Sequence, residues 1–180
     1  LSGVALGGAV LWPTLMLVSG VVMATTPIIA QLNGAGKESE VGEGTRQGLW
    51  IALVLGSLLA MALQNAGPVY GWLGIEADIV AVTTGYLDAV SWGIVPVLGY
   101  FAMRYLCEGL SWTKPAMLIA SGGLVLKIPL NYWFVFGGWG IEPMGAEGCG
   151  WATALIMLLE FIASALVVLL SRIKRGGLFR

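Results

Sequence analysis

Long apolar blocks, each wide enough to cross a lipid bilayer, constrain the fold of this chain more than any other feature. A membrane-spanning helix needs roughly 20 apolar residues, and the blocks lack the sustained period-two alternation of barrel strands. We therefore predict an all-α integral membrane protein, a single bundle over residues 1–180 with five transmembrane helices. Their expected bounds are about 1–32, 47–66, 79–106, 115–136 and 148–171.

The charge content agrees with a lipid environment and excludes several classes of function. Only 11% of the residues are charged, whereas an average globular domain carries about 25%. The net charge of −1 argues against a nucleic-acid partner, and the absence of histidine excludes histidine-based catalytic and metal sites. Since the sequence also lacks nucleotide-binding and nucleophile motifs, we expect neither an enzyme nor a metal site.

The basic residues predict how the helices are oriented. Eight of the nine flank connections on one side of the five-helix path: Lys37, Arg46, Arg104, Lys114, Arg172, Lys174, Arg175 and Arg180. The other two connections, 67–78 and 137–148, contain acidic residues and no Lys or Arg. By the positive-inside rule, we expect the loop 33–46 and the C-terminus to be cytoplasmic. Cys107 and Cys149 then lie near opposite faces and do not bond to each other.

Helix-breaking and small residues occur inside the predicted spans. A proline removes a backbone hydrogen bond and clashes with the preceding turn, so kinks are expected at Pro13, Pro27, Pro96 and Pro129. Two interpretations remain open, bends that line a moving cavity and static kinks tolerated by neighbouring helices. Gly3 and Gly7 form a small-x-x-x-small pattern, which predicts close helix packing.

Three ionisable side chains lie inside the predicted spans, namely Asp88, Lys127 and Glu160. At ~1.5 Å rise per residue, each lies roughly 14–18 Å from the outer end of its helix, close to the middle of a ~30 Å hydrocarbon core. The functional interpretation is a proton- or cation-coupled site with one exchanging carboxylate. The alternative is a structural ion pair plus a carboxyl group that burial keeps protonated.

The fourth predicted helix carries the densest group of polar residues. Lys127 and Asn131 are four residues apart and share one helix face, and Pro129 opens the backbone between them. A cation, an amide and neighbouring aromatic rings form a candidate ligand surface.

Four segments, in this order and spacing, resemble NorM-type multidrug and toxic compound extrusion (MATE) transporters. Together they cover essentially the whole chain, which makes the resemblance more specific than any one segment. They are TPIIAQLNGAG with RQG (26–36 and 46–48), EGLSWTKPAM (108–117), IPLNY (128–132) and GCGWATA (148–154).

The resemblance implies twelve helices in two six-helix lobes, with this chain as helices two to six of the amino-terminal lobe. It implies export of organic cations or drugs in exchange for Na⁺ or H⁺, without another cofactor, in the bacterial inner membrane. The partners would be membrane lipids, a first helix and a second lobe of the same protein. Because the chain begins at Leu1 without methionine and ends at Arg180 beside a basic cluster, we expect a piece of a longer transporter.

The resemblance also assigns the cavity. The family's polar network in its fifth helix maps onto Lys127 and Asn131, and the threonine and methionine of its sixth helix map onto Thr153 and Met157. The family usually has asparagine where this chain has Lys127, so this position departs from the pattern. We expect Asn131, Thr153 and Met157 to line the cavity. We expect Lys127, Asp88 and Glu160 to tune its electrostatics.

Two other functions stay open. Flippases of the same superfamily move lipid-linked sugars through a similar two-lobe cavity, but they would present several cations to a pyrophosphate. The third possibility is a non-transporting membrane subunit that is complete with five helices.

Overall fold

The computed structural model describes residues 2–138, 140 and 142–170, and within them the chain contains helices and no β-strand. The predicted all-α class is therefore confirmed. In chain order the helices are α1 (Ser2–Met23), α2 (Thr25–Gly34), α3 (Glu38–Gln64), α4 (Gly67–Trp72), α5 (Ala77–Ser91), α6 (Ile94–Gly109), α7 (Lys114–Phe136) and α8 (Gly145–Leu170).

Length and apolar composition make most of these helices suitable for crossing a membrane. Four segments are long and apolar enough alone, namely Gly3–Gly34, Ser39–Gln64, Lys114–Phe136 and Gly145–Leu170. The first of these joins α1 to α2 across Ala24. Helices α5 and α6 meet the same criteria as a pair bent by 47°. Counted as one broken span, this pair completes the five spans expected from the sequence.

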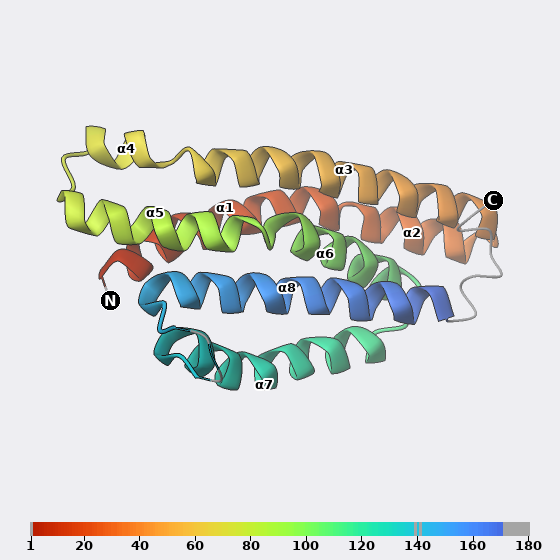
Figure 1. Cartoon of the computed structure of the whole chain (residues 1–180). Coiled ribbons are helices and arrows are strands. Elements are labelled where there is room, and N and C mark those ends of the chain that lie inside the picture. The colour runs from red at the N-terminus through yellow and green to blue at the C-terminus, as the bar shows by residue number, and fades with distance from the viewer. Residues whose placement is uncertain (1, 139, 141, 171–180) are drawn as a thin grey trace.

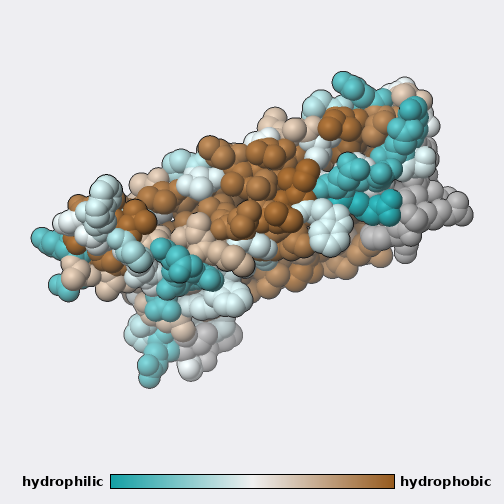
Figure 2. Space-filling view, turned by 90° about the horizontal axis from the view of Figure 1, so that it is seen from above, coloured by the Kyte–Doolittle hydropathy of each residue, from teal (hydrophilic) through white to brown (hydrophobic). Residues whose placement is uncertain are grey.

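The long helices run up and down one bundle (Figure 1). The α2–α3 and α6–α7 connections lie at one end, whereas α4 and the start of α8 lie at the other (Figure 1). Figure 2 shows a hydrophobic band across the middle of one face, with hydrophilic residues gathered toward both ends. This separation is what a membrane-spanning bundle requires. The basic residues expected after the fifth helix and the predicted helix end at Ser171 lie outside the described residues.

Two connections differ from the prediction. The loop expected over 33–46 is largely helical, because α3 begins at Glu38. An ion pair of 2.9 Å between Lys37 and Glu40 spans the start of this helix, and such polar residues continue a helix without entering lipid. The connection 67–78 contains the short helix α4, with Pro68 in its first turn, where a proline needs no amide hydrogen. The length of the apolar blocks predicted neither the early start of α3 nor the short helix α4.

Only two of the four prolines lie at helix breaks. Pro27 and Pro96 are each the third residue of a new helix, α2 and α6, directly after the breaks at Ala24 and at Trp92–Gly93. A proline has no amide hydrogen to donate to the carbonyl four residues earlier. That carbonyl belongs to Met23 for Pro27 and to Trp92 for Pro96. Helices α1 and α7 continue through Pro13 and Pro129, so neither proline ends its helix, and the kinks expected at these two positions stay predictions.

Close packing at small residues joins the helices. The predicted contact surface of Gly3 and Gly7 is confirmed, because it lies against α5. A Cβ atom added at Gly7 would approach the Tyr86 ring to 2.7 Å, and the Thr83 hydroxyl donates a hydrogen bond of 3.2 Å to the Gly3 carbonyl. The buried core between α1, α5 and α6 includes Leu11, Leu87, Val90 and Leu98. Both cysteines are free, as expected.

The break between α5 and α6 allows α8 to approach closely. A Cβ atom at Gly93 would lie 2.8 Å from the Ala154 Cα and 2.7 Å from the Met157 sulfur. Because a backbone atom cannot rotate away as a side chain can, this position tolerates no side chain without moving α8. Gly93 therefore sets the distance between α8 and the broken span.

We expect Gly93→Ala to lower the free energy of unfolding by about 1–3 kcal/mol, the usual cost of overpacking. Gly85→Ala is the matched control in α5, because its Cβ would meet only the Glu147 carboxylate at 4.0 Å. Thermal unfolding in detergent measures both. Equal stability of the two variants would show that α8 is not held by this contact.

The arrangement also predicts opposite exposure of two connections. Ala35 is exposed between α2 and α3, and Val69 is 57% exposed in α4. In a background without Cys107 and Cys149, an impermeant maleimide applied to spheroplasts should label Val69→Cys. It should label Ala35→Cys only after the membrane is permeabilised. Labelling of both from the same side would contradict the orientation derived from charge.

Candidate functional site

A cavity of about 240 Å³ lies between four helices of the bundle. It is mostly apolar, and the charged side chains in its lining are Lys127 and Glu160. Its walls come from α1 (Trp12, Leu15), α6 (Val97, Phe101), α7 (Ala120, Gly123, Leu124, Lys127) and α8 (Thr153, Ile156, Met157, Glu160).

Lys127 reaches from α7 toward α1. Its ammonium nitrogen lies 5.7 Å from the centroid of the Trp12 ring, within the range of a cation–π interaction. The lysine is half-buried and its ammonium group is partly dehydrated. The Trp12 ring compensates for part of the lost hydration. The side chain is thereby directed into the cavity.

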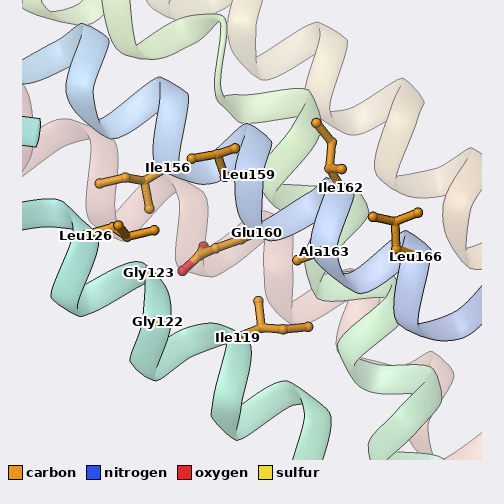
Figure 3. Close-up of a pocket in the computed structure, with 10 residues that line it drawn as sticks. All are labelled: Ile119, Gly122, Gly123, Leu126, Ile156, Leu159, Glu160, Ile162, Ala163 and Leu166. Atoms are coloured by element: carbon orange, nitrogen blue, oxygen red, sulfur yellow. The ribbon is translucent and has the colours of Figure 1, made fainter.

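Glu160 reaches from α8 toward α7 instead. Figure 3 shows its carboxylate pointing at the backbone near Gly123. A Cβ atom at Gly123 would collide with the carboxylate oxygen Oε1 and lie 3.0 Å from Cδ, so the absence of a side chain there makes room for the acid. Neither Lys127 nor Glu160 belongs to an ion pair among the described residues. An ion pair between Arg104 Nε and Glu108 Oε1, at 2.7 Å, lies within α6 and involves neither of them.

Thr153 and Met157 are buried one turn apart on the inner face of α8. The Thr153 hydroxyl donates a hydrogen bond of 2.9 Å to the Cys149 carbonyl, which leaves the oxygen lone pairs for a ligand. The Met157 thioether offers a soft apolar surface that adapts to ligands of different shape.

Two of the predicted site residues lie outside this cavity. Asp88 is exposed on α5 and does not line it. Asn131 is half-buried on α7, and its side-chain oxygen is buried without a hydrogen-bond partner among the described residues. The structure thus brings together Lys127, Thr153 and Met157 with Glu160.

Sequence reasoning missed most of the apolar lining of the cavity, including three residues that shape the site. Trp12 and Phe101 carry no polar signal that separates them from ordinary packing residues, and Gly123 acts through the side chain it lacks. A glycine four residues before an intramembrane lysine is the one hint that the sequence offered. No group of three or more Cys, Asp or Glu side chains within the described ranges is arranged to hold a metal ion.

Comparisons with known proteins agree with this architecture. The family model MatE matches residues 1–133. The chain is 41% identical over 172 residues to the probable multidrug resistance protein NorM of Xanthomonas campestris pv. campestris, covering 96% of this chain and 38% of that protein. It is 39% identical over 163 residues to the multidrug resistance protein MdtK of Proteus mirabilis, covering 90% of this chain and 36% of that protein.

A solved structure has the same fold. It is described as the inward-facing conformation of a multidrug resistance MATE family transporter of the MOP superfamily, and it matches with a TM-score of 0.83 at 20% identity. The match covers 95% of this chain and 39% of that chain, so the chain spans well under half the length of the relatives reported. With the family model matched over most of its residues, the chain belongs to the MatE family of multidrug and toxic compound extrusion transporters.

Proposed function

We propose that these helices form part of a secondary antiporter that exports organic cations in exchange for Na⁺ or H⁺ by alternating access. The relatives are named as multidrug resistance proteins, which supports export of small molecules. In two-lobe transporters the lobes rock around a central binding site. The cavity between α1, α6, α7 and α8 is the part of such a site that this chain supplies.

The observation that carries the proposal is a carboxylate and a cation in one otherwise apolar cavity. A charge in the middle of a membrane costs ~2.5–3.5 kcal/mol or more by insertion scales, so such residues generally serve binding or coupling. Glu160 is able to hold one positive charge, from H⁺, Na⁺ or the substrate. An ion that enters from outside therefore competes with the exported cation, which couples the two by mutual exclusion.

Lys127 is the tuning group in this scheme. A fixed positive charge in the cavity repels every cation that approaches Glu160, and the Trp12 ring keeps that charge in place. Lysine instead of the usual asparagine thus weakens the binding of both the coupling ion and the substrate. Asn131, whose side-chain oxygen is without a partner among the described residues, is the next polar contact along α7.

Drug antiport is favoured over the flippase alternative by the charge of the cavity. A lipid-linked pyrophosphate carries several negative charges and needs several cations. Among the described residues Lys127 is the one cation in the cavity lining, and it shares that lining with an acid. The similarity to multidrug resistance proteins equally favours a transporter over a non-transporting subunit.

The proposed location is the bacterial inner membrane, with the α2–α3 connection in the cytoplasm. The relatives reported come from bacteria. Lys37 lies in the α2–α3 connection and Lys114 begins α7, and these elements meet at one end of the bundle (Figure 1). Glu76 directly precedes α5 and Glu142 lies in the connection from α7 to α8, and both elements lie at the other end (Figure 1). This distribution follows the positive-inside rule.

Replacing the tuning charge tests the proposal. In the transporter of full native length, we expect Lys127→Asn to strengthen binding of the coupling ion, because the repulsion of Glu160-bound cations is removed. The half-saturating Na⁺ concentration should fall, or proton-driven transport should extend to higher pH, by roughly tenfold, which corresponds to ~1.4 kcal/mol. The measurement is ethidium efflux from proteoliposomes under a Na⁺ gradient and, separately, under a pH gradient.

Lys114→Asn is the matched control, because Lys114 is exposed at the start of α7 and outside the cavity lining. It removes the same charge from the same helix and should leave the ion dependence unchanged. If the two variants behave alike, Lys127 does not tune the site. If neither gradient drives efflux by the unchanged protein, the antiport proposal itself is wrong.

A further inference from the structure

A second hollow lies on the other side of Glu160. It is a groove of about 360 Å³ between α7 and α8, within the size range of small-molecule sites. Its walls are almost entirely aliphatic and include Ile119, Leu126, Ile156, Leu159, Ile162 and Leu166 (Figure 3). The groove is therefore suited to an apolar body several ring or chain atoms across.

The groove opens on the apolar outer surface of α7 and α8. Leu126, Ile162 and Leu166 are 47%, 44% and 51% exposed, and all three lie in helices apolar enough to cross a membrane. Within this chain, the walls are therefore apolar, open to the outside of the bundle and part of two membrane-spanning segments.

One charged group lies in this aliphatic groove. Glu160 is its only charged lining residue among those described, and Figure 3 shows the carboxylate directed across the groove toward α7. Opposite it, Gly123 leaves room for the carboxylate itself, and the space beside Gly122 is open. The nearest cation in the adjoining cavity, Lys127, is drawn toward Trp12, and no ion pair of the described residues neutralises Glu160.

Glu160 also belongs to the inner cavity. The groove and the cavity share Gly123, Ile156 and Glu160 in their linings. The carboxylate thus stands in the partition between the membrane side and the interior of the bundle.

We propose that this groove is a membrane-facing binding site for a monovalent amphipathic organic cation, with Glu160 as its counter-ion. The aliphatic walls hold the apolar body of the cation, and the carboxylate, costly to keep unpaired in hydrocarbon, holds its charge. The proposal deepens the proposed export of organic cations by giving the substrate an entry site on the bilayer side. Binding at this site does not require that transport occurs.

Filling each hollow separately distinguishes the groove from the cavity. Ala163 lines the groove alone and Ala120 lines the cavity alone, so Ala163→Phe and Ala120→Phe form a matched pair. The probe is radiolabelled tetraphenylphosphonium, bound at equilibrium to the full-length transporter in phosphatidylcholine nanodiscs, with empty nanodiscs as background. We expect Ala163→Phe to weaken binding at least about tenfold and Ala120→Phe to change it less than about threefold.

A second set of variants tests the charge. Glu160→Gln should weaken tetraphenylphosphonium binding at least about tenfold and leave binding of the neutral triphenylphosphine oxide unchanged. Gly123→Ala should also weaken binding of tetraphenylphosphonium, because the added Cβ atom collides with the Glu160 carboxylate. Gly122→Ala should not, because nothing lies within 4 Å of its Cβ. These variants decide the matter if Ala163→Phe fails to give a monodisperse protein.

The remaining outcomes separate failure of this proposal from failure of the antiport proposal. Loss of binding in Ala120→Phe with full binding in Ala163→Phe places the cation in the inner cavity. Sensitivity to Ala163→Phe without sensitivity to Glu160→Gln indicates that a lipid chain or another apolar group occupies the groove. If cation binding follows the expected pattern but neither gradient drives efflux, the site stands and the antiport proposal fails.

Discussion

A backbone that crosses lipid must satisfy its own hydrogen bonds, and this requirement makes every crossing of the chain a helix. Lipid supplies no hydrophobic force that pushes helices together, so they associate through close contact at small residues. Gly7 against the Tyr86 ring and Gly93 against the Ala154 backbone are such contacts. These approaches set the rotation of each helix, and the rotation decides which side chains face inward.

Helix α8 shows how packing turns a plain apolar segment into a functional surface. It lies beside α5, α6 and α7, and its inner face buries Thr153 and Met157. Glu160, about one turn after Met157, meets α7 where Gly123 leaves room. The same helix therefore contributes adaptable contacts to the interior and a charge to its boundary.

The two charges of the cavity form no ion pair with each other. Lys127 contacts the Trp12 ring, whereas Glu160 turns to the α7 backbone (Figure 3). Since the two side chains form no ion pair among the described residues, the proposed antiport leaves the carboxylate available to exchangeable cations, with the lysine limiting how tightly they bind. Weak, competitive binding of this kind suits a protein that must release what it binds.

The sequence by itself determined the all-α class, the approximate spans and the family, because these depend on local composition and on ordered motifs. It also supplied Lys127, Thr153, Met157 and Glu160 as candidates. Only the tertiary structure decided that Asp88 is exposed and outside the cavity lining. It also decided that Lys127 lies near the Trp12 ring, that Glu160 lies against Gly123, and that Glu160 lines both hollows. Depth along a helix is readable from residue numbers, but the face that a residue presents depends on how neighbouring helices pack.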